Sequence, residues 1–271
     1  MEERLNKLLS GLGICSRREA DRLIEEGKVL VDGKRARMGQ KVSAGQQVVC
    51  EGRLVWGTQM ADGGEKAEKM RRPEPVLLAV HKPRGVVCTT TDKDRAPNIV
   101  DMIHYPVRVY YVGRLDKDSE GLVLMTNEGD LVNKVMRSGN AHEKEYRVTV
   151  DRPVTEDFLN RMRKGIYLKD LDRTTLPCQA AKVGEREIRV ILVQGLNRQI
   201  RRMCAACGYQ VRRLVRTRVM NIRLDGLKKG EYRRIEGEER KEFLKLLEHS
   251  TNLTYKQQRM GEKRWKIKFR E

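Results

Sequence analysis

One carboxylate, Asp116, stands in a polar turn that is bounded by Gly113 and Gly121 and lies between two apolar runs. Farther along the chain, between Ile188 and Leu224, there are nine arginines but no lysine, aspartate or glutamate. Guanidinium groups are planar and permanently charged, and they donate paired hydrogen bonds that match phosphate oxygens. The combination predicts an enzyme that holds RNA through arginines and uses one carboxylate for chemistry.

The turn around Asp116 has two other interpretations. Glycine, aspartate and serine are the usual residues of surface turns, and the segment on its own favours an ordinary turn over catalysis. Asp116, Asp118 and Glu120 also fit the first positions of a calcium loop. The twelfth position of that loop needs a glutamate, however, and the chain has Asn127 there, so calcium is disfavoured.

The composition narrows the class of partner. The chain has 271 residues, a formal net charge of +19 and a pI near 9.9, which favour a polyanion, either nucleic acid or an anionic membrane surface. Membrane attachment is the weaker option because no apolar run approaches the roughly 20 residues of a spanning helix. Six dispersed cysteines and no recognisable export signal predict reduced thiols in the cytoplasm.

Two of these cysteines form a short pair that invites a metal or redox interpretation. Ile200, Met203, Cys204 and Cys207 follow the i, i+3, i+4, i+7 spacing of a buried helical stripe. No second ligand pair is nearby in the sequence, so core packing is predicted for both thiols. We therefore expect no metal site.

The chain divides into four predicted parts. Residues 1–57 begin with apolar residues at helical spacing and continue with short strands, while residues 58–75 have the composition of a flexible linker. Residues 76–236 alternate strand-like runs with short helices, and residues 237–271 predict a helix and a basic tail. The irregular gaps between strands favour an α+β fold with a mainly antiparallel sheet flanked by helices.

The predicted elements of residues 76–236 are short. Alternating apolar residues predict strands at Val76–Val80, Val86–Thr90, Val109–Val112, Leu122–Thr126, Tyr146–Val150 and Arg189–Val193. Helices are predicted at Asp130–Arg137, at Glu156–Lys164 with Thr155 as N-cap, at Arg198–Cys207 with Asn197 as N-cap, and farther on at Glu238–Glu248. The arginines of the helix at Arg198–Cys207 are expected to form a positively charged groove. We expect this groove to continue along the next strand through Arg212, Arg213, Arg216 and Arg218.

Two arginines near the N-terminus have an unusual position. Ser16 starts a predicted helix with Glu19 as capping-box partner, so Arg17 and Arg18 fall in its first turn, where positive charge opposes the helix dipole. On these residues alone, a ligand-binding role and a solvated surface are equally open. The region resembles the small RNA-binding domain called S4-like in the segments Arg4–Lys7, Ser16–Ile24 and Gly27–Gly33. The resemblance implies docking on structured RNA through Arg17 and Arg18.

The rest of the chain closely resembles the pseudouridine synthases, in the RsuA-like subgroup that has an S4-like domain ahead of the catalytic domain. The segments that carry the resemblance are Lys82–Gly85, Gly113–Asp116, Lys144–Tyr146 and Gly195–Met203. His81 stands where asparagine is usual, at a position that is not catalytic in the family. Two further segments are most similar to members that modify large-subunit ribosomal RNA, namely Asp130–Lys134 and Gly139–Tyr146.

The resemblance implies a role for each matched residue. Asp116 is the catalytic carboxylate and Arg201 its basic partner, which keeps the acid ionised by its charge. Tyr146 stacks on the extruded base, and Arg114 enters the RNA helix as the nucleotide leaves. Substrate-binding roles are expected for Arg17, Arg18, Lys82, Lys144, Arg198, Gln199 and Arg202.

The implied reaction breaks the N1–C1′ bond of a uridine and rejoins the same base through C5. This isomerisation involves no redox change, so no cofactor is expected. Asp116 could form a glycosyl adduct or abstract the 2′ proton, and the sequence leaves both routes open. The implied partner is a stem-loop of 23S ribosomal RNA, with transfer RNA as a second candidate, and the implied state is a monomer that contacts no membrane.

Two other functions stay open. The chain could be an RNA-binding or ribosome-assembly protein in which the turn at Asp116 is inert. It could also be an N-glycosidase that releases a base, although the sequence offers no convincing acid/base carboxylate to pair with Asp116. Tritium release from uridine labelled at C5 separates isomerisation from both alternatives.

Overall fold

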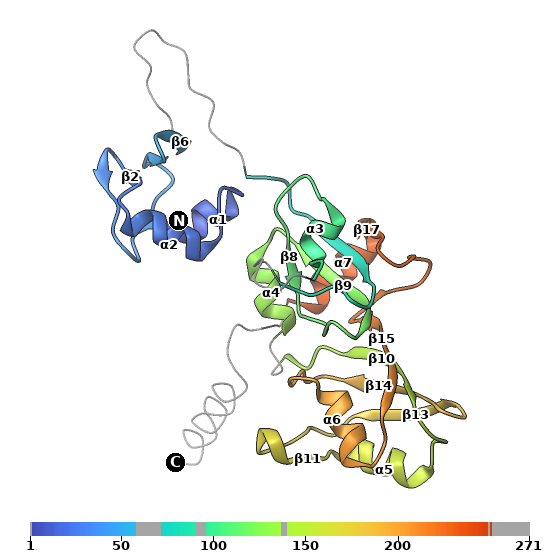
Figure 1. Cartoon of the computed structure of the whole chain (residues 1–271). Coiled ribbons are helices and arrows are strands. Elements are labelled where there is room, and N and C mark those ends of the chain that lie inside the picture. The colour runs from blue at the N-terminus through green and yellow to red at the C-terminus, as the bar shows by residue number, and fades with distance from the viewer. Residues whose placement is uncertain (1, 58–71, 90–95, 137–139, 249, 251–271) are drawn as a thin grey trace, which may run out of the picture. The chain divides into compact units, whose positions relative to one another are not determined.

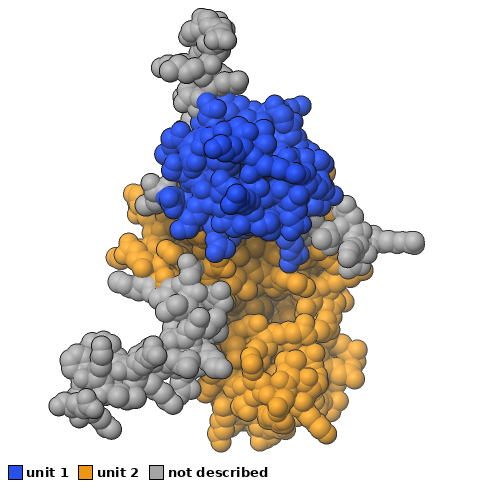
Figure 2. Space-filling model, turned by 90° about the vertical axis from the view of Figure 1, so that its left-hand side faces the viewer, with its two compact units in different colours: residues 1–75, 106–108 blue, residues 76–105, 109–271 orange. Residues whose placement is uncertain are grey.

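The computed structural model describes residues 2–57, 72–89, 96–136, 140–248 and 250. The chain forms two compact units, which Figure 2 shows in different colours. Unit 1 contains residues 1–75 and 106–108, and unit 2 contains residues 76–105 and 109–271. Most of the predicted linker and nearly all of the predicted basic tail lie outside the described residues.

Unit 1 combines two short helices with small antiparallel sheets. The helices are α1 (Leu5–Gly11) and α2 (Arg17–Glu25). One sheet has the order β3 (Lys34–Arg35), β2 (Val29–Val31), β5 (Val48–Cys50) and β6 (Arg53–Trp56), and a separate pair is formed by β1 (Glu3–Arg4) and β4 (Lys41–Val42). Leu5, Leu9 and Ala20 of the helices and Val29 and Val48 of the sheet share one apolar core.

The start of α2 follows the sequence prediction. The hydroxyl of Ser16 accepts a hydrogen bond from the backbone nitrogen of Glu19 at 3.0 Å, which satisfies a free N–H of the first turn. The carboxylate of Glu19 pairs with Arg22 instead of returning to the cap. Arg17 and Arg18 are exposed in this first turn, where their charge is available to a ligand.

Unit 2 is built on one nine-stranded sheet, whose strands appear in Figure 1 from cyan to orange-red. The main path of the sheet runs in the order β13 (Gln179–Gly184), β14 (Glu187–Leu192), β10 (Lys144–Val150), β15 (Val211–Val219), β9 (Glu120–Thr126), β7 (Leu77–Lys82) and β17 (Tyr232–Arg234). Two short strands join its side, β8 (Tyr110–Val112) on β9 and β16 (Ile222–Arg223) on β15. A separate hairpin is formed by β11 (Tyr167–Leu168) and β12 (Arg173–Thr174).

Helices pack against this sheet at several places. They are α3 (Ile99–Ile103), α4 (Gly129–Met136), α5 (Glu156–Lys164), α6 (Gln199–Ala206) and α7 (Gly237–Leu246), with a 3₁₀ turn η2 at Lys169–Leu171. In α5 the hydroxyl of Thr155 caps the backbone nitrogen of Phe158, as the sequence predicts. The helix predicted in the C-terminal extension belongs to the core of unit 2, because Phe243 and Leu247 pack with Leu77 and Leu124.

One strand pairing organises the centre of the sheet. The ladders of the nine-stranded sheet are antiparallel except for β9 and β15, where Val215 lies opposite Glu120 and Arg216 opposite Gly121. Gly121 has a φ of +116°, and a Cβ at this residue would lie 2.3 Å from the carbonyl oxygen of Arg216. Glycine therefore permits the close approach of two strands at the point where the turn of Asp116 enters the sheet.

Two predicted elements need correction. Val86–Thr90 was predicted as a strand, but in the described part of this segment Val87 makes an isolated bridge with Asn98, and Thr90 is outside the described residues. The N-cap of α6 is Arg198, in the left-handed conformation with φ +50°, and not Asn197. None of the described helices has the length and apolar character needed to cross a membrane.

The cysteines are free thiols. Cys204 is fully buried on the inner face of α6, and burial raises the pKa of its thiol to about 12. The core role predicted for Cys204 is therefore observed. Cys207, at the C-terminal end of the same helix, is half-buried.

Candidate active site

The turn that carries Asp116 links β8 to β9 and is held by backbone contacts. The backbone nitrogen of Ser119 donates to the carbonyl oxygen of Asp116 at 3.0 Å, and that of Gly85 donates to the carbonyl oxygen of Lys117 at 2.8 Å. Gly113, with φ +80°, lets the chain leave β8 in a conformation that other residues rarely adopt. The carboxylate of Asp116 is thus positioned by a turn fixed on both sides.

Asp116 lies on the wall of a cavity of about 320 Å³. Residues from several parts of unit 2 line this cavity: the turn itself, β10, β15, the start of α6 and the segment that leads into it, together with Met136 of α4 and Leu192 of β14. The lining includes Arg114, Asp116, Lys144, Tyr146, Asn197, Arg198, Gln199 and Arg216. Segments that are far apart in the sequence thus meet at the predicted carboxylate.

Tyr146 and Lys144 reach the cavity from one face of β10, because residues two apart on a strand point the same way. Tyr146 is 9% exposed, so its ring is held by the packing around it. Arg114, on the segment that leads into the turn, also lines the cavity but is exposed to solvent. The predicted acid, the predicted stacking aromatic and one arginine therefore share a single concave site.

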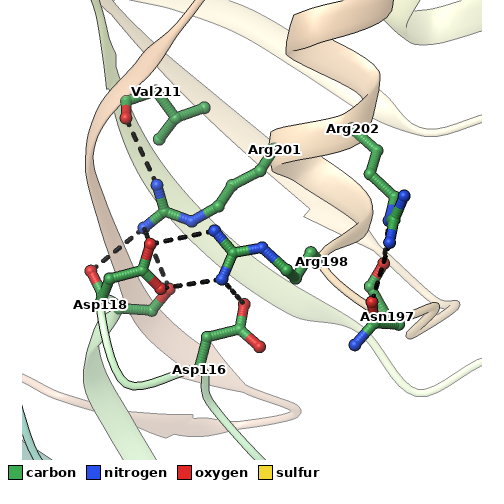
Figure 3. A network of polar contacts seen from close by, with 8 residues as sticks. Asp116, Asp118, Asn197, Arg198, Arg201, Arg202 and Val211 are labelled. Atoms are coloured by element: carbon green, nitrogen blue, oxygen red, sulfur yellow. Dashed lines mark hydrogen bonds and ion pairs between the residues drawn. The ribbon is translucent and has the colours of Figure 1, made fainter.

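Asp116 faces a guanidinium, but not the one that the family resemblance implied. Arg198 Nη1 lies 3.8 Å from the carboxylate of Asp116, and the same guanidinium binds Asp118 through two hydrogen bonds of 3.1 Å, as Figure 3 shows. The left-handed backbone of Arg198 aims this side chain from the start of α6 across the cavity mouth toward the turn.

Arg201, the expected partner of Asp116, instead braces the turn behind it. Its Nη2 donates to the carbonyl oxygen of Asp118 at 3.1 Å and to the hydroxyl of Ser119 at 3.3 Å, and it forms an ion pair with the Asp118 carboxylate. Its Nη1 donates to the carbonyl oxygen of Val211 at 3.3 Å (Figure 3). Arg201 thus ties the turn to the start of β15.

Asp118 joins the two arginines and was not predicted as a site residue. Burial raises the pKa of its carboxyl, but the hydrogen bonds from Arg198 and the charge of Arg201 outweigh burial and hold that pKa below its ordinary value. Asp118 is therefore ionised at neutral pH and occupies both guanidinium groups. The signal available in the sequence was its spacing, two residues after Asp116 and on the same turn.

The other predicted substrate-binding residues of unit 2 differ in their surroundings. Gln199 lines the cavity, but its amide oxygen accepts a hydrogen bond from the backbone nitrogen of Leu196 at 2.9 Å and so holds the loop before α6. Arg202 donates to the carbonyl oxygen of Asn197 at 3.0 Å and pairs with Asp170, outside the cavity lining.

Lys82 is fully buried, and its ammonium donates to the carbonyl oxygens of Pro83 and Val86 at 2.8 and 2.7 Å. Its contacts close the turn after β7, and it is not part of the cavity lining. The predicted RNA-binding arginines Arg17 and Arg18 belong to unit 1, so they are not brought together with the cavity residues by the fold of unit 2.

The arginines of β15 do not form the continuous groove that was expected. Arg213 donates to the buried carboxylate of Glu120 at 2.7 Å, and Arg218 forms ion pairs with Glu143 and Glu145. Arg212 is exposed on the strand. Arg216, by contrast, is buried and lines the cavity, which sequence spacing could not distinguish from its neighbours.

Comparison with known proteins identifies a family for each of the two units. Residues 76–206 match the RNA pseudouridylate synthase family, and residues 3–48 match the S4 domain. The dual-specificity RNA pseudouridine synthase RluF of Escherichia coli K12 is 48% identical over 249 residues, which cover 92% of this chain and 81% of that protein.

More distant relatives extend the match to almost the whole length of another member. The ribosomal large subunit pseudouridine synthase B of Bacillus subtilis is 32% identical over 256 residues, which cover 92% of this chain and 99% of that protein. A crystal structure of a pseudouridylate synthase superposes with a TM-score of 0.62 at 27% identity, covering 90% of this chain and 99% of that one. The chain therefore belongs to the RNA pseudouridine synthases, the isomerases that convert uridine to pseudouridine, in the group with an S4 domain ahead of the catalytic domain.

Proposed function

We propose that this protein isomerises one uridine of 23S ribosomal RNA to pseudouridine in the cavity at Asp116. The observation that carries the proposal is the meeting of a carboxylate, a buried aromatic ring and a guanidinium 3.8 Å from the carboxylate in a cavity of about 320 Å³. The name of the Bacillus subtilis relative specifies the large ribosomal subunit, which supports this choice of RNA. The name of the Escherichia coli relative specifies dual specificity, which supports a second RNA substrate, and we propose transfer RNA for it.

In the proposed mechanism the target nucleotide leaves its helix and enters the cavity. Arg114, which is exposed, takes up space in the RNA as the base departs, and Tyr146 stacks on the extruded ring, which is worth about 1–3 kcal/mol. Asp116 then acts at the sugar, either on C1′ as a nucleophile or on the 2′ proton as a base. Both routes use the carboxylate of Asp116, which lies 3.8 Å from the guanidinium of Arg198.

The remaining assignments are proposals about the whole chain. Residues 1–57 are proposed to dock on RNA through Arg17 and Arg18, and residues 58–75 to link this domain to the catalytic domain expected at 76–236. Because α7 packs into the core of unit 2, the catalytic domain is proposed to include this helix, and the rest of residues 237–271 to form a basic extension. We further propose that the enzyme works as a monomer in the cytoplasm and requires no cofactor, since the isomerisation involves no redox change. Lys82, Lys144, Gln199 and Arg202 are proposed to support substrate binding directly or by holding the cavity walls.

The test is to incubate the protein with 23S ribosomal RNA, 16S ribosomal RNA and transfer RNA, each labelled with tritium at C5 of uridine. Isomerisation predicts tritium release from 23S RNA, with no free uracil. Release of uracil would support an N-glycosidase instead. Binding without any turnover on the three RNAs would support an RNA-binding protein with an inert turn.

A further inference from the structure

One buried cation at the cavity has no counter-ion in the part of the chain that the structure describes. Arg216 is 2% exposed, and its Nε donates to the carbonyl oxygen of Leu122 at 2.7 Å. Its Nη2 is buried and has no hydrogen-bond partner among the described residues, and no carboxylate forms an ion pair with it there. A guanidinium buried in this way is unfavourable unless a ligand completes its hydrogen bonds.

The direction of Arg216 follows from strand register. On β15 it stands opposite Tyr146 of β10, and a register shift next to Tyr146 places Arg218 opposite Glu145. Cross-strand partners point to the same face of a sheet, so Arg216 shares its face with Tyr146 and, two residues earlier on β10, with Lys144. All three side chains line the cavity that holds Asp116.

Lys144 adds a second buried cation to this face. It is 6% exposed, and its ammonium donates to the carbonyl oxygen of His142 at 3.2 Å, which leaves two of its three N–H bonds without a hydrogen-bond partner among the described residues. Burial, and then the charge of Arg216, lower the pKa of Lys144 to about 8. Lys82 differs from Lys144 because it is not part of the cavity lining and two backbone carbonyls bind its ammonium.

The reaction creates a negative charge for which these cations are suited. When the C1′–N1 bond breaks, its electron pair stays on the ring, and the charge spreads over the two carbonyl oxygens of the pyrimidine. We infer that Arg216 and Lys144 form a binding site for these oxygens and stabilise the detached pyrimidine anion beside Tyr146. The inference rests on the proposed function and adds the feature that keeps the base in place between cleavage and reattachment.

The step is balanced without any added reagent. The ring turns in the cavity and its C5 forms the new bond to C1′. In the glycosyl-adduct route this bond displaces the carboxylate of Asp116 from C1′, and in the 2′-proton route C5 adds to C1′ of the glycal while Asp116 returns the proton to C2′. The proton then leaves C5 for solvent, and N1 takes up a proton from solvent. Arg216 and Lys144 stay protonated and act by charge and hydrogen bonding, which is the same contribution in the glycosyl-adduct and 2′-proton routes.

The test compares Arg216→Met, Arg216→Lys and Lys144→Met with the control Arg147→Met. Arg147 is on β10 like Lys144, but is exposed and paired with Glu187. Each protein, used in excess, reacts once with RNA that carries uridine or 5-fluorouridine at the target site. Chromatography of the digested RNA measures the loss of the starting nucleoside, because a ring with fluorine at C5 has no C5 proton to release. RNA affinity is measured separately by fluorescence anisotropy.

The expected result is a loss of about 100-fold in single-turnover rate for Arg216→Met, with RNA affinity changed by less than about threefold. Fluorine withdraws electrons and stabilises the ring anion by itself, so on 5-fluorouridine the loss should shrink by about tenfold. Lys144→Met should behave in the same direction, and Arg147→Met should match the wild type. If Arg216→Met does not fold, the rates of Arg216→Lys on uridine and 5-fluorouridine are compared instead, and a smaller rate loss is expected.

Two results would overturn the inference. An affinity loss that accounts for the whole rate loss would show that Arg216 binds an RNA phosphate instead of the detached base. An equal rate loss on uridine and on 5-fluorouridine would show that it only supports the strand junction. The wild-type rate itself tests the proposed function, whereas the ratios between variants test this inference, so the two can fail separately.

Discussion

At the scale of single residues, two carboxylates in one turn have different surroundings. Asp118 accepts hydrogen bonds from Arg198 and forms an ion pair with Arg201, so its oxygen atoms are occupied. Among the described residues, Asp116 has one ion pair, at 3.8 Å, and its 32% exposed side chain lines the cavity. Asp116 is therefore free to meet a sugar atom, while Asp118 orders the guanidinium groups around it.

Asp118→Asn is expected to loosen this arrangement without removing the nucleophile. The free energy of unfolding should fall by about 1 kcal/mol, because the hydrogen bonds are charged but Asp118 is well exposed to solvent. The pKa of Asp118 is lowered on folding, so its stabilisation is present at neutral pH and is lost as pH falls through the folded pKa. Urea denaturation at several pH values should therefore show the difference from wild type shrinking below about pH 4. A difference that grows toward acid pH would contradict this role.

The lowered pKa of Lys144 predicts that activity falls at alkaline pH. The pKa of its ammonium is lowered to about 8, first by burial and then by Arg216 on the facing strand, so the cation is lost as pH rises through that value. Single-turnover rates should fall above about pH 8. Because the folded pKa is below the unfolded one, the same deprotonation should raise the free energy of unfolding across this range.

Lys144→Arg is the matched test, since arginine keeps its proton over the same range. Rates measured from about pH 6.5 to about pH 9 should lose the alkaline decline in this variant. An identical decline in both proteins would assign the titration to another group.

The sequence predicted several residues that the fold brings into one cavity, but not their contact partners. Resemblance of short motifs identified Asp116, Tyr146 and the arginines of α6, and the cavity contains the first two together with Arg198. Which guanidinium pairs with Asp116 depends on the left-handed backbone of Arg198, and no pattern in the sequence specifies that conformation. The burial of Arg216 depends likewise on strand register, which is set by long-range pairing.

At the scale of elements, the parallel contact of β9 and β15 connects the turn of Asp116 to the arginine strand. The pairing brings Arg216 opposite Gly121, and the Nε of Arg216 then reaches the carbonyl oxygen of Leu122. Arg201 ties the same turn to Val211 at the start of β15. The site is thus assembled across a junction between segments that are distant in sequence.

Gly121→Ala should break this junction. Its φ is +116°, and a Cβ would lie 2.3 Å from the carbonyl oxygen and 2.5 Å from the nitrogen of Arg216, so the strands would have to separate. The strained backbone alone should lower the free energy of unfolding by about 1–3 kcal/mol, and the clash should lower it further.

Gly226→Ala is the control for Gly121→Ala, because Gly226 also has a positive φ, +74°, but nothing lies within 4 Å of its added Cβ. Thermal unfolding should show a clearly lower melting temperature for Gly121→Ala than for Gly226→Ala. Equal melting temperatures would mean that the close approach of β9 and β15 is not required.

Local patterns predicted most elements of unit 2, because alternating and helical apolar spacings reflect which face is buried. Glu156–Lys164 forms α5 with the bounds that its capping residue and terminal glycine predict. Val86–Thr90 failed because an apolar run becomes a strand only where a neighbour pairs along it, and here Val87 bridges Asn98 alone among the described residues. The order of the strands in the sheet was beyond what local patterns encode.

At the scale of the whole molecule, a net charge of +19 suits a chain that binds a polyanion through more than one unit. Arg17 and Arg18 are exposed in the first turn of a nine-residue helix, where the helix dipole does not favour them. We therefore expect these two arginines to contribute to RNA binding and not to the stability of unit 1.

The double variant Arg17→Ala/Arg18→Ala is expected to bind 23S ribosomal RNA more weakly. The slope of log affinity against log salt concentration should fall by roughly 1–2, one counter-ion step for each lost phosphate contact. The rate on a small stem-loop should be unchanged. An unaltered salt slope and affinity on full-length RNA would remove the docking role from these arginines.

The central claim, that the carboxylate of Asp116 performs the chemistry, is tested most directly by tritium release from C5-labelled uridine in one turnover of RNA-bound protein. Asp116→Asn keeps the size of the side chain and removes the charge, and Asp225→Asn removes an exposed charge elsewhere in unit 2 as the control. We predict that Asp116→Asn binds RNA with near wild-type affinity and releases no tritium, while Asp225→Asn releases it at the wild-type rate. Tritium release by Asp116→Asn at a rate near that of wild type would contradict the assignment.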